Sequence, residues 1–584
     1  MMMANKKIYL ALLSGLLFGA GRSDAQNFNP TVSVTRAYEG KLMEVHKPSI
    51  EMNVPDSLTK FNLDFDYSVF ENPYKGSYDF KPYTLDMKPV QEPYSGRSLY
   101  LKAGAGWLMR PYMDFVWEPQ FKKRFRMSLY ATHRSFIGKY GIEGLDAKSN
   151  IDLLDGKMDG YDMETRAGIR GRADFDKGFL SFDAGYQGIH TKDSISAVGW
   201  NAANASLRVR SVNPGDTYFF YDAGIYCRYG TQGVAPSGCL KMSDIDFLGS
   251  FGPVVRQHNS FLVDLGVGVT AYSSLFSSTN GVFSVTPKYV IDRSRWNMTL
   301  GAQVALRLGS GDVFNGSELN TGKGQIVYPD VHIGIKAVKD YLNIYLSATG
   351  GLDRNSYASL KEKRHFFNPY YSTGFGPMSQ NTVERFNLAA GLEGNISGKF
   401  RYDVRFGYVS YKDAPVDAVY YSSNTLETVM LPALAFKTFD LVYSDILLQW
   451  ESRDVSVDSR FHIKSSNLDE HIEPCFELSF FSGDLKAKYN YKKRIFASVT
   501  ADFASRRSGF ANNAAISAGE DEQIIFMKCH IPAYVNLGAE LEFALTRTFS
   551  LWLRGDNLLN MNVQRSPFHY QGGIGLTAGI CLNL

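Results

Sequence analysis

After residue 20 the sequence lacks any apolar run of about 18 residues, the length at which a helix can span a bilayer, so no helical membrane span is expected. Cysteine is scarce, with five in 584 residues, and these form no CxxC pair and no cysteine–histidine cluster. A metal site built on thiolates is therefore disfavoured. A dominant charge is also missing, because the formal net charge is only +3, which argues against a nucleic-acid partner.

Catalytic signatures are absent as well. Ten histidines are present, but none stands in an HExxH sequence, and no GxSxG stands at a strand-to-helix turn. No side chain can be assigned as a nucleophile or a general base from its spacing. We therefore predict that the chain is not an enzyme and has no cofactor or metal.

The first 25 residues have the pattern of a secretory signal peptide. Lys6 and Lys7 form a basic start, residues 8–20 are an apolar run, and Ser-Asp-Ala precedes Gln26. The run is shorter than the roughly 20 residues that a membrane helix needs. We expect residues 1–25 to be removed on export.

A two-residue period dominates the rest of the chain. Apolar and polar side chains alternate over residues 261–271, 296–307, 386–392, 400–408, 455–463 and 535–543, and again over the last eleven residues, 574–584. Strict alternation over about seven or more residues predicts strands with one apolar face. Aromatic residues, 14% of the chain, suit such strands.

A β-sandwich and a transmembrane β-barrel can both be built from strands of this kind. The predicted strands run to about 10–14 residues, whereas strands average about 5–6 and a tilted membrane strand needs about 9–11. Tight turns, for example at 397–398 and 451–453, alternate with long links near 135–160, 309–324, 352–383, 412–432 and 505–533. Short periplasmic turns and long outer loops produce this alternation in membrane barrels.

The sequence therefore predicts an all-β chain. Residues 98–584 should form a transmembrane antiparallel β-barrel of about 22 strands, in which residues 475–489 make one strand and the final strand closes against the first. An even strand number places both ends of the barrel in the periplasm.

Residues 26–97 form a separate leader that holds seven of the 21 prolines. Proline alternates there with tyrosine and phenylalanine, which favours an extended or polyproline conformation over a packed domain. Two interpretations remain open. The leader is either a periplasmic linker or a segment that enters the barrel and lines its lumen, because a lumen of about 22 strands is normally plugged.

Two short sequences point to a known family. FSLWLRGDNLLNMNV, residues 549–563, is similar to a late strand that ends in an Asn-Leu-(Leu/Phe)-Asn element, and TVSVTRAYEG, residues 31–40, is similar to an apolar box that contacts TonB. With the barrel size, they resemble the TonB-dependent receptors of bacterial outer membranes. The resemblance implies an outer-membrane location, solute uptake and a periplasmic partner. The conventional plug domain of that family has no counterpart in residues 26–97.

Three sets of side chains are candidates for function. Polar residues expected to face the lumen include Arg401, Asp403, Arg405, Arg460, His462, Glu540 and Arg554. Basic and aromatic residues of the outer loop 352–383 could capture a ligand, although aromatics are common near a membrane interface in any case; they are Arg364, His365, Phe366, Phe367, Tyr370 and Tyr371. Cys227 and Cys239 flank another predicted outer loop and are either a disulfide or two free thiols.

The expected function is uptake or passage of a solute across the outer membrane. The alternatives are a non-transporting barrel that acts as a scaffold or partner in an envelope complex, and a passive, partly occluded porin. The expected partners are outer-membrane lipid, an unidentified solute, and TonB or another periplasmic protein that contacts residues 26–97.

Overall fold

The computed structural model describes residues 98–584 with short gaps. The gaps are residues 120, 122–123, 142–157, 193–196, 212–217, 235–237, 256–258, 275–276, 312–324, 340, 369–380, 425–426, 469–474, 514–525 and 568. The predicted signal peptide and leader lie outside the described residues, as do the candidate ligand residues Tyr370 and Tyr371.

Almost all regular structure is β. The first half of the barrel consists of β1 (Leu99–Trp107), β2 (Tyr112–Trp117), β3 (Phe125–Gly141), β4 (Met158–Phe175), β5 (Gly178–Lys192), β6 (Ala197–Ser211), β7 (Phe219–Val234), β8 (Gly238–Val255), β9 (Asn259–Ser273), β10 (Ser278–Asp292), β11 (Trp296–Gly311), β12 (Val327–Val338) and β13 (Leu342–Asp353). The second half consists of β14 (Thr382–Ile396), β15 (Phe400–Asn424), β16 (Glu427–Glu451), β17 (Val455–Ser466), β18 (Phe481–Tyr491), β19 (Ile495–Ala504), β20 (Arg507–Asn513), β21 (Phe526–Ile531), β22 (Tyr534–Ala544), β23 (Phe549–Asp556), β24 (Val563–Ser566), β25 (His569–Gln571) and β26 (Gly575–Asn583).

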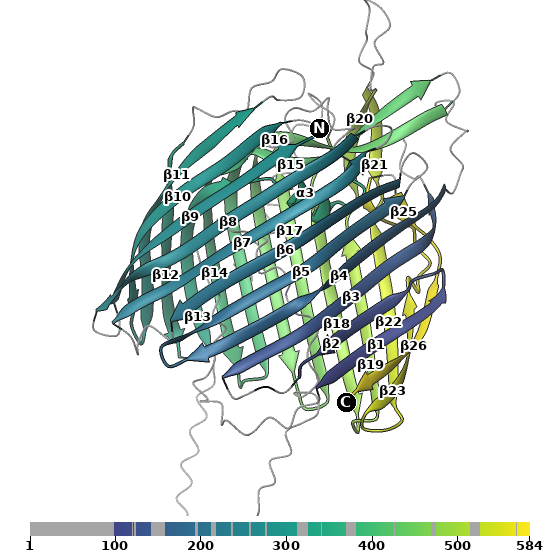
Figure 1. Cartoon of the computed structure of the whole chain (residues 1–584), viewed down its shortest axis with the longest axis horizontal. Helices are drawn as coiled ribbons and strands as arrows, with labels where there is room; N and C mark the ends of the chain where they lie inside the picture. The colour runs from purple at the N-terminus through teal and green to yellow at the C-terminus, as the bar shows by residue number, and fades with distance from the viewer. Residues whose placement is uncertain are drawn as a thin grey trace, which may run out of the picture. The chain divides into compact units, whose positions relative to one another are not determined.

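These strands close into one barrel (Figure 1). β1 to β19 pair in sequence order, β19 pairs with β22, β23 pairs with β26, and β26 returns to β1 with Tyr100 opposite Asn583. The ring has 22 antiparallel strands. β20 with β21, and β24 with β25, form two further hairpins at the long-loop end. The predicted fold class, the strand number and the closure by the last strand are confirmed.

The outer face of the ring is an apolar belt. Leu346 is 56% exposed, Val442 55% and Leu576 50%, and the residues on either side of each along the strand point the other way. Exposed aromatic side chains gather at the short-turn end, where strands meet tight turns; they include Trp296, Tyr341, Trp450, Tyr489 and Tyr491. An apolar band with an aromatic border is the surface that a lipid bilayer requires of a barrel.

Two predicted boundaries differ from the structure. Residues 475–489 are not one strand, because β18 begins at Phe481. Residues 476 and 477 instead bond to the outer ends of other strands, with the Phe476 N–H donating to the Asp417 carbonyl at 2.9 Å. The link 412–432 is largely strand as well, since β15 and β16 continue as a long hairpin to Asn424 and Glu427.

One helix is described, α3 (Tyr357–Lys363), in the link between β13 and β14. Among the residues that the structure describes, no helix has both the length and the apolar character to cross a membrane.

Candidate functional site

The link between β13 and β14 folds into the barrel. Residues 354–368 of this link contain α3 and are called the inner loop (Figure 1). The buried side chains of Tyr357, Ala358 and Leu360 belong to one apolar cluster with residues of β5, β6, β8, β9 and β16: Ile189, Trp200, Ala202, Leu240, Met242, Tyr272 and Leu434. β16 stands far around the ring from β5–β9. A segment that touches both walls lies in the barrel interior.

Local hydrogen bonds shape the inner loop. The Ser356 hydroxyl caps α3 by accepting from the Ser359 N–H at 3.3 Å. At the other end Lys361, which is fully buried, donates from Nζ to the carbonyls of His365 and Phe367, the second at 3.1 Å. An ammonium that satisfies carbonyls beyond the end of a helix stabilises that end. The loop therefore has a defined conformation inside the lumen.

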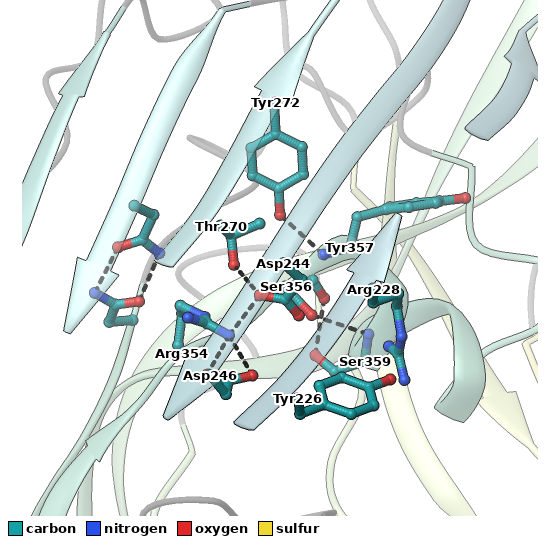
Figure 2. A network of polar contacts seen from close by, with 12 residues as sticks. Tyr226, Arg228, Asp244, Asp246, Thr270, Tyr272, Arg354, Ser356, Tyr357 and Ser359 are labelled. Carbon is teal, nitrogen blue, oxygen red and sulfur yellow. Dashed lines mark hydrogen bonds and ion pairs between the residues drawn. The ribbon is translucent and has the colours of Figure 1, made fainter. Parts of the chain in front are cut away.

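An ion-pair network fixes the start of the inner loop to the wall (Figure 2). Arg354 Nη2 lies 2.5 Å from Asp244 Oδ1 and 2.7 Å from Asp246 Oδ1, both on β8, and the arginine side chain is 3% exposed. The Thr270 hydroxyl donates to Asp244 at 2.8 Å. A buried arginine that binds two carboxylates gives a position-specific anchor, because its removal would leave both charges uncompensated.

Further contacts anchor the rest of the inner loop. Tyr272 accepts from the Tyr357 N–H at 2.9 Å, and the Tyr357 hydroxyl donates to Gln232. Arg364 Nε lies 2.5 Å from Asp417 Oδ1 on β15. Asp417 Oδ2 also forms an ion pair with Arg507 Nη1 of β20, at 2.9 Å. These bonds tie the inner loop to opposite sides of the ring.

His365 is a titratable contact of the inner loop. Its Nδ1 lies 2.7 Å from Asp162 Oδ1 on β4. Burial by itself lowers the pKa of His365, but the hydrogen bond and the charge of Asp162 outweigh it, so that the pKa is raised above its ordinary value. The contact with Asp162 thus makes His365 easier to protonate than a histidine in water.

The candidate ligand residues of this loop are packed rather than presented to solvent. Phe366 is 9% exposed and stacks on His569 with ring centroids 4.2 Å apart, and Phe367 is 3% exposed. Arg364 and His365 form the ion pairs described above. Phe366 and Phe367 are not exposed, because the loop turns inward and buries them against the barrel wall. Their role in ligand capture stays a prediction.

The polar residues predicted to face the lumen lie on the strand face opposite the apolar belt. Five of them share the wall formed by β15 and β17: Arg401, Asp403, Arg405, Arg460 and His462. The Tyr345 hydroxyl donates to Asp403 at 2.8 Å and accepts from Arg405 Nε at 3.1 Å. His462 Nδ1 lies 2.6 Å from Asp445 Oδ1, and Arg460 is directly opposite Asp484. Charges of opposite sign therefore pair across this wall.

The remaining two residues of that set, Glu540 and Arg554, lie near the closing seam. Glu540 Oε1 is 2.5 Å from Lys102 Nζ on β1, and Arg554 Nε is 2.9 Å from Asp556 Oδ1. Lys102 also lies 5.0 Å from the centre of the Trp552 ring. The structure thus separates the predicted set into two groups on different strands.

The proposed disulfide is not formed. Both Cys227 and Cys239 are free thiols. In the β7–β8 hairpin Cys227 is opposite Ile245, whereas Cys239 is opposite Gly233, so the two cysteines are offset along the strands. An offset of several residues, at about 3.3 Å each, exceeds the roughly 7 Å limit between bonded Cα atoms.

Sequence reasoning missed the residues that anchor the inner loop. The sequence did indicate Asp244 and Asp246 as a pair of charges on one face, since they stand two residues apart on the polar face of β8. Their partner Arg354 is 110 residues from Asp244, and no local pattern connects them. Within the part of the chain that the structure describes, no group of three or more His, Cys, Asp or Glu side chains could hold a metal ion.

The fold of this chain is similar to that of known proteins, although its sequence is not. No protein-family model matches the chain, and no curated protein matches it. Solved structures of TonB-dependent receptors do match: the FrpB iron transporter of Neisseria meningitidis has a TM-score of 0.57 at 8% identity, over 83% of this chain and 80% of that one. The ferric enterobactin receptor of Pseudomonas aeruginosa, in complex with enterobactin, has a TM-score of 0.56 at 9% identity, over the same shares. The siderophore receptor PirA of Acinetobacter baumannii has a TM-score of 0.56 at 8% identity, again over 83% and 80%. The architectural resemblance to these receptors is confirmed.

Proposed function

We propose that this chain is an outer-membrane barrel that carries a solute into the periplasm, and that the inner loop gates the passage. A closed ring with an apolar outer belt and a polar interior supports a membrane location and an aqueous path. The solved structures with the same fold are named as transporters and receptors, which supports transport over catalysis.

The observation that carries the proposal is the anchoring of the inner loop. Arg354 binds β8 while Arg364 binds β15, so the loop is held from both sides of the lumen by charged contacts. Charged contacts of this kind can be broken by a competing ligand or by hydration, unlike a purely apolar plug. The loop argues against a permanently open porin, which is the passive alternative.

Residues 26–97 supply the second part of the proposal. We assign to this leader the contact with TonB or another periplasmic protein, because the short sequence at 31–40 is similar to an apolar TonB-contacting box. Site-specific photo-crosslinking from Val34 in living cells tests the assignment. A TonB adduct is expected, and its absence from several neighbouring positions would contradict it.

Single-channel conductance of the purified full-length chain in planar bilayers tests the gate. We expect the wild-type protein to be closed and the double variant Arg354→Ala, Arg364→Ala to open a large conductance. A matched control, Arg293→Ala at an exposed tight turn, should stay closed. An open wild-type channel would favour the porin, and silence from the double variant would favour a non-transporting scaffold.

A further inference from the structure

We propose that the β20–β21 hairpin at the long-loop end controls the inner loop through Asp417, so that displacement of the hairpin releases the gate. This inference rests on the proposed gating function and names how the gate is regulated. Neither strand of the hairpin belongs to the ring, because β19 pairs directly with β22. A movement of the hairpin therefore does not require the barrel wall to open.

One carboxylate joins the hairpin to the inner loop. Asp417 lies on the outer part of β15, which continues beyond the tight packing of the ring as a long hairpin with β16. Its Oδ1 is 2.5 Å from Nε of Arg364 in the inner loop, and its Oδ2 is 2.9 Å from Nη1 of Arg507 on β20. The inner loop and the hairpin thus bind different oxygens of the same side chain.

This bridge is charged and largely withdrawn from water. The side chains of Asp417 and Arg507 are each 16% exposed. Burial by itself raises the pKa of Asp417, but the charges and hydrogen bonds of Arg364 and Arg507 outweigh it and lower the pKa to about 2. Asp417 is therefore ionised near neutral pH, and the bridge consists of one anion between two cations.

Backbone hydrogen bonds hold the hairpin beside Asp417. The Phe476 N–H donates to the Asp417 carbonyl at 2.9 Å, and the Phe510 N–H of β20 donates to the Cys475 carbonyl at 3.3 Å. A short extended segment thus lies between β15 and β20, with Phe476 opposite Gly509 of β20. Gly509 permits this approach, because a Cβ there would stand 2.5 Å from the Cys475 carbonyl oxygen. A larger residue at this position would force β20 away.

The second hairpin of the long-loop end belongs to the same set of contacts. Arg507 Nη2 donates to the carbonyl of Arg565 on β24 at 3.3 Å. The His569 ring of β25 stacks on Phe366 of the inner loop, with ring centroids 4.2 Å apart. A movement of β20 therefore reaches the inner loop by two routes, through Asp417 and through the β24–β25 hairpin.

Displacement of the hairpin weakens the hold on Arg364. While β20 is in place, little water reaches Asp417, and its attraction for Arg364 is strong. When β20 moves away, water reaches the carboxylate, the local dielectric constant rises and the attraction falls. The departing Arg507 also stops repelling Arg364, but in water neither charge–charge interaction is large. The loss of the buried attraction therefore decides the sign.

Hydrogen exchange of the α3 amides in the full-length protein, folded into lipid vesicles at pH 7, tests the inference. Gly509→Val keeps all three charges but displaces β20, whereas Arg507→Gln removes the ion pair on the hairpin side. Each should speed α3 exchange about tenfold or more, because a hydrogen bond between charged groups is weakened or lost. Arg507→Lys, which keeps the charge, should lie between Arg507→Gln and the wild type.

The matched control is Lys528→Gln, which removes one exposed charge from β21 of the same hairpin. It should leave α3 exchange at the wild-type rate. An equal effect of Lys528→Gln, or unchanged exchange in both Gly509→Val and Arg507→Gln, would overturn the proposal. The heat-dependent gel mobility of each variant shows that its barrel is closed, so that misfolding is not mistaken for release of the loop.

The double variant Arg364→Gln, Arg507→Gln tests whether the hairpin acts through Asp417. Its α3 exchange should equal that of Arg364→Gln alone, because the first change already breaks the connection. Coupling is reciprocal, so Arg364→Gln should also speed exchange of the Phe510 amide on β20. Effects that multiply in the double variant, or a Phe510 amide that does not respond, would overturn the proposal.

Conductance tests the gating function separately from this coupling. Faster α3 exchange in the hairpin variants, with no conductance from Arg354→Ala, Arg364→Ala, would support the coupling and contradict the gate. A conducting Arg354→Ala, Arg364→Ala with unchanged α3 exchange in the hairpin variants would contradict only the coupling.

Discussion

At the scale of single residues, the guanidinium of Arg354 fixes the inner loop to two buried carboxylates of the barrel wall. Replacing Arg354 by Ala leaves Asp244 and Asp246 buried without their cation, and breaking a buried ion pair in this way costs about 3–5 kcal/mol. We expect the midpoint of urea unfolding in vesicles to fall, with increased proteolysis of the inner loop. Arg293→Ala, at an exposed turn, should change neither measurement, and equal behaviour of the two variants would contradict the anchoring role.

His365 makes the docking of the inner loop depend on pH. Burial lowers the pKa of His365, but the hydrogen bond and charge of Asp162 and the charge of Glu164, both on β4, raise it, and Lys361 from α3 lowers it; the net pKa is raised. The histidine therefore stabilises the docked loop fully below its ordinary pKa of 6.5, and this stabilisation is lost as pH rises through the raised value.

Hydrogen exchange of the α3 amides, corrected for intrinsic rates, measures this dependence. In the wild type, protection should be high at pH 6 and should decline as pH rises through the raised pKa of His365. His365→Gln should show weaker protection that no longer varies over that range. A wild-type profile that is flat, or that rises with pH, would contradict the assignment of the Asp162 contact as the controlling one.

At the scale of elements, α3 shows what tertiary contacts can impose on a short segment. It has seven residues, fewer than the roughly 12 that an isolated helix needs, so it forms because the barrel wall packs around it. No helical period in the sequence pointed to it. The neighbouring strands were predictable, because each has one apolar face and one polar face, and these faces appear in the sequence as alternating apolar and polar residues.

The seam between β26 and β1 depends on glycines that let Trp552 lie flat on the inner face. A Cβ at Gly579 would stand 2.0 Å from the Ala103 carbonyl oxygen and 2.6 Å from Trp552 Cε2, closer than real contacts allow. Gly579→Val should destabilise closure by about 1–3 kcal/mol, the usual cost of overpacking. Gel electrophoresis after heating measures this change, because the folded and unfolded barrels migrate differently. The temperature at which the folded band is lost should be lower for Gly579→Val.

Gly233 provides the matched control for the seam, since a Cβ there meets nothing within 4 Å. Gly233→Val on β7 should retain the wild-type conversion temperature. If Gly579→Val were as stable as this control, the close packing of Gly579 against Ala103 and Trp552 would be unimportant for closure.

At the scale of the whole molecule, contact between the apolar belt and lipid contributes to the free energy of folding. Leu346 lies in β13 and is 56% exposed on the outer face. An arginine there would meet lipid, which costs about 2–4 kcal/mol near the bilayer midplane. Leu346→Arg should therefore unfold at lower urea in lipid vesicles than the wild type.

Ser347→Arg is the neighbouring control, because Ser347 has the opposite parity and faces the polar interior between His332 and Ala389. Ser347→Arg should lower the free energy of unfolding much less than Leu346→Arg. Similar costs for both substitutions would mean that the two faces do not meet lipid and water as assigned, and the membrane location would be wrong.

The sequence by itself determined the class of the fold, the strand number and the closing contact of residues 574–584. Alternation, strand length and link length are local properties of the sequence. They recur at every strand, because each strand crosses the bilayer with one face toward lipid and the other toward the aqueous lumen. It also indicated a polar interior, from residues such as Arg405 and His462.

Only the tertiary structure decided how that interior is used. The inward turn of the inner loop, the burial of Phe366 and Phe367, and the meeting of Arg354 with Asp244 join segments far apart in the chain. Strand register likewise places Arg126 on β3 directly opposite Arg172 on β4. Such contacts depend on ring closure and on side-chain packing across the lumen, and neither leaves a periodic pattern in the sequence.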